Sequence, residues 1–177
     1  MATDTWTLDP AHSAFNFTVR HMVISKVRGN FGKFAVELKL DPANLATASA
    51  TATVDTASIS TGVGDRDNHL RSPDFFDAAG HPALSFVSRK VEVVSREAFT
   101  LTGDLTIRGT TRPITLAGEF GGTAKDPWGN LRAGFALKGS LNRKDFGLTW
   151  NQALETGGVL VGETVELDVE LEFIKKA

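Results

Sequence analysis

The chain of 177 residues contains no cysteine and no tyrosine, and its basic residues do not outnumber the acidic ones. Without cysteine, disulfides, thiolate nucleophiles and cysteine-ligated metals are excluded. Nineteen Lys and Arg against 21 Asp and Glu give a net charge of −2, which argues against an electrostatic nucleic-acid binder. The aromatic residues are twelve Phe and three Trp, so most of the aromatic surface carries no polar atom.

Targeting and membrane-spanning signals are also missing. Residues 1–6 lack the basic and apolar segments of a secretory signal, and no apolar run approaches the ~20 residues of a membrane-spanning helix. We therefore expect a cytoplasmic protein without a transmembrane segment.

Apolar and polar residues alternate with a period of two along most of the chain, which is typical of strands with one buried face. Eight strands are expected, at residues 15–20, 34–40, 48–54, 84–87, 99–107, 114–120, 131–141 and 165–173. The short connections rich in Gly, Pro, Asn and Asp favour antiparallel pairing. A closed barrel or a sandwich fits this pattern, and closure of a barrel removes exposed edges. Either fold is one all-β domain over residues 1–177.

The alternation also predicts which side chains face the barrel interior and would contact an apolar ligand: Phe15, Phe17, Val19, Phe34, Val36, Phe86, Phe99, Leu101, Phe120, Phe135, Leu137 and Phe173. An eight-stranded barrel is just wide enough to be filled by side chains or to hold one small ligand. Small residues on the same parity, such as Ala50, Ala52 and Gly103, either leave a void or relieve crowding.

A helical segment is expected at residues 61–80, between the third and fourth strands, with a second short turn from Pro73. It contains the densest polar cluster of the chain. Arg66 and Asp67 are interpreted as a structural network that anchors this helix, with Asp145 as a further member that pairs with Arg143 or with the helix.

Two basic residues continue inward-facing rows, His21 after the first strand and Arg143 after the seventh. In an up-and-down barrel the carboxyl ends of the first, third and seventh strands lie at the same mouth. His21, His69, Arg143 and Trp150 are therefore the candidates for contact with a ligand head group. The structural alternatives are a His that caps the core, an Arg in a surface ion pair and a Trp that pins the loop at residues 145–162.

Motifs for metal binding and nucleophilic catalysis are lacking. The four His show no close ligand pair, and no G-x-S-x-G, Walker A or G-x-G-x-x-G segment occurs. No metal, cofactor or catalytic residue is predicted.

Ordered segments along the chain resemble the YceI-like family of lipocalin-like barrels. They are Trp6-Thr7-Leu8-Asp9, His12-Ser13, Phe17 to Met22, Gly29-Asn30-Phe31, Thr61-Gly62, Arg66 to Leu70, Ser72 to Asp77, Pro82, Phe86, Ser88, Gly103 to Gly109, Pro113, Arg143, Asp145 to Leu148 and Gly162. The resemblance implies an eight-stranded antiparallel barrel with a long apolar pocket for an isoprenoid or fatty-acyl chain, and no established catalytic activity. Many relatives are periplasmic.

Three functions remain open at this point. The first is binding, carriage or sequestration of a long apolar lipid, such as a polyisoprenoid, an isoprenoid quinone or a fatty-acyl chain, with a homodimer possible. The second is an enzyme that acts on a lipid or quinone, with His21 or His69 as acid and base. The third is a stress-related structural or interaction module whose core is filled.

Overall fold

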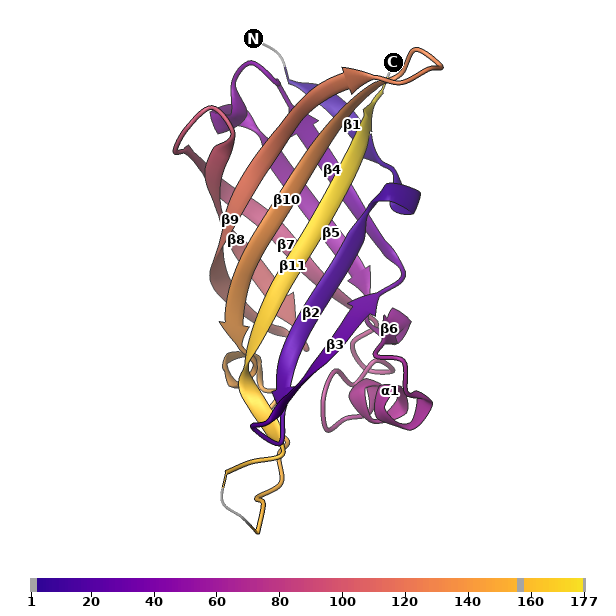
Figure 1. Ribbon diagram of the computed structural model, residues 1–177, viewed down its shortest axis with the longest axis vertical. Helices are drawn as coiled ribbons and strands as arrows, with labels where there is room; N and C mark the ends of the chain where they lie inside the picture. The colour runs from indigo at the N-terminus through magenta and orange to yellow at the C-terminus, as the bar shows by residue number, and fades with distance from the viewer. Residues whose placement is uncertain (1–2, 156–157, 177) are drawn as a thin grey trace.

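One antiparallel sheet closes into a barrel in the computed structural model, which describes residues 3–155 and 158–176 (Figure 1). The strands are β1 Asp4–Leu8, β2 Ala14–His21, β3 Ser25–Phe31, β4 Phe34–Leu40, β5 Ser49–Asp55, β6 Ile59–Ser60, β7 Ala83–Val93, β8 Ala98–Ile107, β9 Thr110–Lys125, β10 Leu131–Asn142 and β11 Val161–Lys175. The helices are α1 Gly64–Arg71 and the 3₁₀ turns η1 Pro10–His12, η2 Leu45–Thr47, η3 Thr56–Ser58 and η4 Arg143–Phe146.

These strands fill eight positions around a closed ring, as the sequence predicted. β1 and β2 share one position, because β1 pairs with the carboxyl end of β11 and β2 with its amino-terminal part. β3 and β4 share the next position, and β5 and β6 the one after it. The pairing of β1 with β11 closes the barrel.

Three strands were missed by the alternation pattern, namely β1, β3 and β6. β1 has a single buried residue, Trp6, and β6 has only two residues. In β3 the inward positions include Gly29, while Lys26 and Arg28 dominate the outer face. Short or glycine-interrupted strands give too few alternating apolar residues to be recognised.

The helical segment is shorter than predicted. α1 ends at Arg71, and Ser72 closes it by donating a hydrogen bond from Oγ to the His69 carbonyl at 2.6 Å. The second short turn predicted from Pro73 is present, and in it the Ser72 carbonyl accepts from the amides of Phe75 and Asp77.

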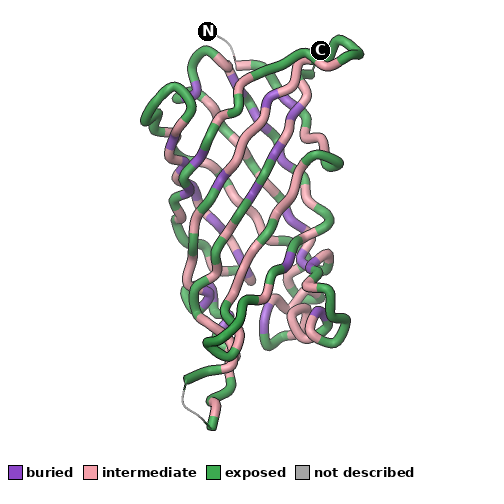
Figure 2. Tube along the Cα trace, in the orientation of Figure 1, coloured by how far each residue is buried: buried purple, intermediate pink, exposed green. Residues whose placement is uncertain are grey.

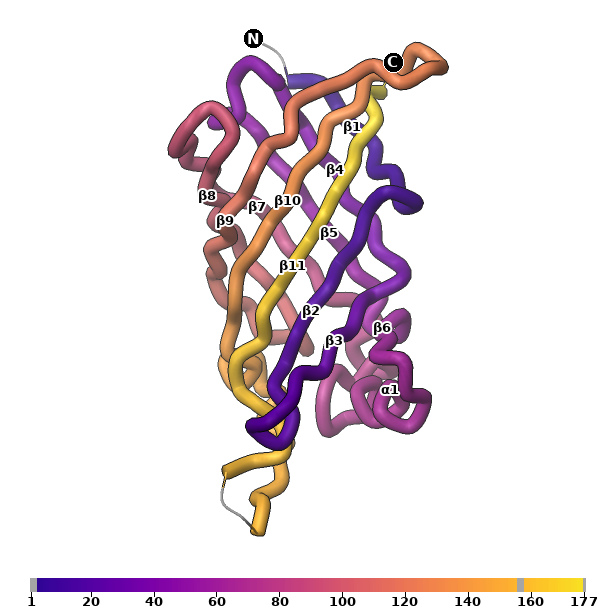
Figure 3. The backbone as a smooth tube through the Cα atoms, in the orientation of Figure 1, coloured from indigo at the N-terminus to yellow at the C-terminus, as the bar shows by residue number. Residues whose placement is uncertain are grey.

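We call the end with both chain termini the upper end, and the end with the β2–β3 turn and α1 the lower end (Figure 3). Buried residues follow the strands, and exposed ones gather on the turns at both ends (Figure 2). Part of the interior is filled by aromatic rings. The Phe135 ring lies 5.0 Å from Phe120, 6.1 Å from Phe99 and 5.9 Å from Phe173, between ring centroids.

An arginine joins three separate segments on the outside of the barrel. Arg132 Nε donates to Asp126 at 2.8 Å, and its Nη1 donates to Asp9 at 2.7 Å and to Glu172 at 2.9 Å. These bonds fix the junction between β1 and β2 against β11 and the β9–β10 turn. Asp9, His12 and Glu172 also bring potential metal ligands close together. The guanidinium of Arg132 already supplies the positive charge there, so we assign no metal to them.

The bonds from Arg132 lower the pKa of two carboxyl groups. The pKa of Asp126 falls from 3.8 to about 2, chiefly because Arg132 donates to it. The pKa of Asp9 is lowered as well, through Arg132 first and His12 second. A carboxyl with a lowered folded-state pKa adds stability above its ordinary pKa and loses it as the pH falls toward the folded-state value.

We therefore predict that the free energy of unfolding decreases as the pH falls from 3.8 to about 2. Arg132→Leu should lower the free energy of unfolding at about pH 5 and weaken its dependence on pH below that. Urea unfolding at a series of pH values measures both effects.

The control is Arg89→Ala, because Arg89 pairs with Asp104 on the outer surface and its side chain is 69% exposed. This variant should keep the pH dependence of the wild type. An Arg132→Leu protein with the wild-type pH dependence would contradict the assignment.

Candidate functional site: an apolar cavity at the lower end

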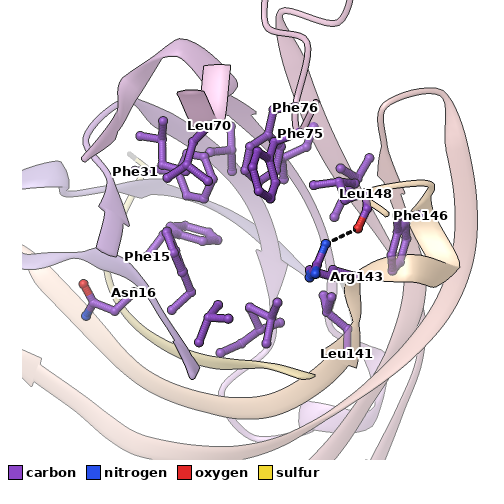
Figure 4. A pocket seen from close by; sticks show the side chains of 18 of the residues that line it. Phe15, Asn16, Phe31, Leu70, Phe75, Phe76, Leu141, Arg143, Phe146 and Leu148 are labelled. Carbon is purple, nitrogen blue, oxygen red and sulfur yellow. Dashed lines mark hydrogen bonds between the residues drawn. The ribbon is translucent and has the colours of Figure 1, made fainter. Parts of the chain in front are cut away.

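A cavity of about 490 Å³ occupies the lower part of the barrel (Figure 4). Its walls are almost entirely apolar side chains from the strands and from the segment after α1. A second void of about 60 Å³ lies next to it and shares Val36, Leu101 and Leu137 as lining. The larger volume is in the range of pockets that hold small molecules.

Many of the side chains predicted to contact a ligand tail do line this cavity. They are Phe15, Phe17, Val19, Val36, Phe86, Leu101 and Leu137. They come from strands on several sides of the ring, so the cavity lies inside the barrel. The small residues Ala50 and Ala52 of β5 line it as well.

The remaining predicted tail contacts lie elsewhere: Phe34, Phe99, Phe120, Phe135 and Phe173 are not among the cavity-lining residues. Phe99, Phe135 and Phe173 line the smaller void, Phe120 stacks on Phe135, and Phe34 packs on Phe15. Alternation assigns a side chain to the inner face but says nothing of its height along the barrel. The rings therefore close the upper part of the interior, and the cavity does not run along the whole barrel.

Two glycines make room for rings in the lower part of the barrel. A Cβ atom on Gly103 would lie 2.3 Å from Cζ of Phe86, and one on Gly29 would lie 2.4 Å from Cζ of Phe17. Each ring therefore occupies the space that a side chain on the glycine would need. The glycines relieve crowding, which was one of the two interpretations, and Gly118 does the same for Phe99 in the closed part.

The end of α1 and the segment after it supply a wall that strand patterns did not predict. Leu70, Phe75 and Phe76 project into the cavity beside Phe31 of β3 (Figure 4). Phe31 and Phe76 meet edge to face at 5.7 Å between ring centroids. The apolar pair Phe75-Phe76 within a polar segment was the signal that could have revealed this wall.

Arg143 lies in the cavity wall and is only 4% exposed. Its Nη1 donates to the carbonyls of Leu148 at 2.6 Å and Trp150 at 2.9 Å, and its Nε donates to Gly162 at 2.8 Å. Nη2 donates to Val161 at 3.2 Å. Burial lowers the pKa of the guanidinium, and the charge of Glu163 opposes this shift. Arg143 thus holds both ends of the loop between η4 and β11.

The other head-group candidates line the same cavity. Nε2 of His69 lies 2.9 Å from a carboxylate oxygen of Asp74, and the side chain of His69 is 38% exposed. The Trp150 ring meets the His69 ring edge to face at 4.6 Å and the Phe75 ring at 5.5 Å between centroids. His21 ends β2 opposite Val161. The structure therefore brings His21, His69, Arg143 and Trp150 to one rim.

The predicted polar network is built around Thr61, which the sequence did not single out. Asp67 accepts a hydrogen bond from the amide of Thr61, while Arg66 donates to the Thr61 hydroxyl at 2.7 Å and carbonyl at 2.8 Å. Arg66 and Asp67 are adjacent on α1, so their side chains do not face each other. Asp145 is exposed, and no hydrogen bond among the described residues joins its carboxylate to Arg143 or α1. Its carbonyl accepts from Arg112 instead.

Comparison with known proteins identifies the family. The model of the YceI-like domain matches residues 6–173. The chain belongs to the YceI-like family. A UPF0312 protein of Staphylococcus epidermidis is 40% identical over 166 residues, which cover 93% of this chain and 94% of that protein.

Solved structures of YceI-like barrels superpose on this one. The YceI protein of Campylobacter jejuni has a TM-score of 0.78 at 34% identity, covering 89% of this chain and 90% of that one. A polyisoprenoid binding domain from Saccharophagus degradans has a TM-score of 0.68 at 16% identity, covering 97% and 98%, and shows the shared fold. Within residues 3–155 and 158–176, no helix has the length and apolarity to cross a membrane.

The loop anchored by Arg143 gives a prediction for this YceI-like protein. Arg143→Lys replaces a planar fork of donors with one ammonium that cannot reach all four carbonyls. Each buried carbonyl left without a donor costs about 1–3 kcal/mol, so we expect a loss of at least about 2 kcal/mol in the free energy of unfolding. Hydrogen exchange at the amides of Leu148, Leu160 and Val161 should also become faster.

Lys144→Met is the matched control, because Lys144 follows directly and pairs with Glu163 while half exposed. A surface pair of this kind contributes about 0–1 kcal/mol. Equal effects of the two substitutions would contradict the role assigned to Arg143.

Proposed function

We propose that this protein binds a long apolar lipid in the lower cavity and carries or sequesters it. The observation that carries the proposal is the cavity itself, with a volume of about 490 Å³, nearly continuous apolar walls and a rim where polar groups gather. Water in such a space would find few hydrogen-bonding partners, whereas a hydrocarbon chain would contact apolar side chains on every side.

The energetics favour a chain over a compact polar metabolite. Each buried methylene contributes about 0.8 kcal/mol, so one five-carbon isoprene unit offers about 4 kcal/mol before ordering costs. Affinity should therefore rise with chain length until the chain reaches the rings around Phe135. A polyisoprenoid, an isoprenoid quinone and a fatty-acyl chain all satisfy this requirement.

The rim would contact the head group. Arg143 carries a buried positive charge whose four hydrogen bonds go to carbonyls rather than to a carboxylate. A buried charge without a carboxylate in hydrogen-bonding contact favours a ligand with a negative or electron-rich head, such as a carboxylate, a phosphate or a quinone carbonyl. His69 and Trp150 lie on the same rim and would add contacts.

Two alternatives remain distinguishable from lipid carriage. The pair His69–Asp74 on the rim favours an enzyme acting on a lipid or quinone, since a carboxylate beside a His is suited to acid–base chemistry. A filled-core interaction module is disfavoured by the open lower cavity, although the rings around Phe135 do fill the upper part. The Saccharophagus degradans neighbour is described as a polyisoprenoid binding domain, which supports binding over turnover.

The proposal requires no metal or cofactor. A cytoplasmic location and a homodimer stay predictions from the sequence.

We predict that organic extraction of the purified protein, followed by lipid mass spectrometry, releases a long-chain lipid. Ala52→Phe should then lower the affinity for long polyprenyl or acyl probes by about tenfold, which corresponds to the loss of about two buried methylenes. The reason is that Ala52 lines the cavity and the new ring would occupy it.

The control is Thr53→Phe, one residue further along β5 on the exposed outer face. It should bind the probes as the wild type does. Absence of any co-purified lipid, together with no binding of either probe class, would refute the proposed function.

A further inference from the structure

Four exposed apolar side chains of the β2–β3 turn and the loop before β11 form what we call the apolar tip, at the lower end of the barrel (Figure 3). Met22, Val23 and Ile24 make the β2–β3 turn and are 41%, 58% and 84% exposed, and Val159 of the neighbouring loop is 38% exposed. The two loops are joined, because the amide of Met22 donates to the Leu160 carbonyl at 2.8 Å. The tip therefore projects as one unit.

The backbone conformation of the turn indicates that Met22 and Val23 do not serve to stabilise the turn itself. Met22 has φ of 53° and Val23 has φ of 66°, in the left-handed region that favours Gly and Asn. For a β-branched residue such as Val23 this conformation is strained, and strain of this kind concentrates at functional sites. A stable hairpin alone would be better served by Asn-Gly at these positions.

Positive charge without a partner lies directly behind the tip. Arg20 and Lys26 are opposite each other on the outer face of β2 and β3, and Arg28 is also exposed. Like charges in such a pair repel. No carboxylate of the described residues forms a salt bridge with any of the three, and residues 10–36 contain no Asp or Glu at all.

The tip is continuous with the mouth of the cavity. His21, which leads into the turn, lines the cavity, and so do Leu160 and Val161 beside Val159. Whatever the tip contacts is thus brought against the opening through which a ligand would pass.

We propose that the lower end docks on the surface of an anionic lipid bilayer. The apolar tip enters the head-group region, and Arg20, Lys26 and Arg28 lie against the lipid phosphates. A few inserted apolar side chains backed by basic residues are the arrangement by which proteins bind a membrane surface without spanning it. The anionic phosphates also relieve the repulsion between Arg20 and Lys26.

A bilayer fits this surface better than a second protein. The tip consists of four side chains on two narrow loops, whereas a specific protein interface usually buries about 800 Å² on each partner. Docking depends only on the outer surface. Transfer of a lipid between the bilayer and the cavity would in addition rest on the proposed function.

The experiment is co-sedimentation with vesicles of phosphatidylcholine, either pure or containing phosphatidylglycerol. The wild type should bind the anionic vesicles and release them when salt is raised from about 0.1 M to about 0.5 M, because the Debye length shortens. Lys26→Gln with Arg28→Gln should weaken binding by about fivefold for each charge removed. Val23→Gly with Ile24→Ser should weaken it by about tenfold.

Folding and docking are separated by the choice of variants. Val23→Gly relieves the strained φ, so that protein should be at least as stable as the wild type while it binds vesicles less well. Trp128→Ser is the control, because Trp128 is 80% exposed in the β9–β10 turn at the upper end. It should leave vesicle binding unchanged.

Several outcomes would overturn docking. They are no binding of the wild type to anionic vesicles, equal binding by the tip variants, loss of binding in Trp128→Ser alone, or a dimer through the tip detected by light scattering. Binding of a soluble acyl probe in the absence of vesicles tests the cavity by itself. A tip variant that keeps probe binding but loses vesicle binding supports docking independently of the proposed function.

Discussion

The interior of this barrel depends on where its phenylalanine rings find room. In the lower part, Phe86 lies over Gly103 and Phe17 over Gly29, at distances that no side chain on either glycine would permit. Around Phe135, rings contact one another across the interior and close it, and Phe99 among them lies over Gly118 in the same way. The same residue type therefore builds both the cavity and its closed end.

The rim of the cavity is held by a second interaction of a different kind. Arg143 is buried in an apolar wall, yet its bonds reach carbonyls at both ends of the loop between η4 and β11. One guanidinium thus positions Trp150 and the loop that carries Val159, and it leaves a positive charge beside the cavity. The mouth, the head-group contacts that we propose and the tip that we propose to enter a bilayer all depend on this arrangement.

The sequence allowed the barrel, its strand directions and the shared rim to be predicted, because alternation fixes which face of a strand is apolar and antiparallel order fixes which ends meet. It did not reveal the height of a side chain along the barrel, so Phe99 and Phe173 were assigned to the ligand although they pack at the closed end. It also missed Phe31 and Phe76, since β3 is interrupted by glycine and the segment after α1 has no strand pattern. Polar partners such as Arg132 and Asp9 are distant in sequence, and no local pattern joins them.

The most direct test of the central claim is the location of a bound chain. The protein is crystallised with a long fatty acid brominated near its end, and diffraction is measured at the bromine absorption edge. The anomalous signal then locates the bromine atom, and with it the end of the chain, directly. The account predicts an anomalous peak deep in the lower cavity, between Ala52 and Leu137, with the carboxylate toward Arg143. A peak on the outer surface, or between the rings around Phe135, would contradict it.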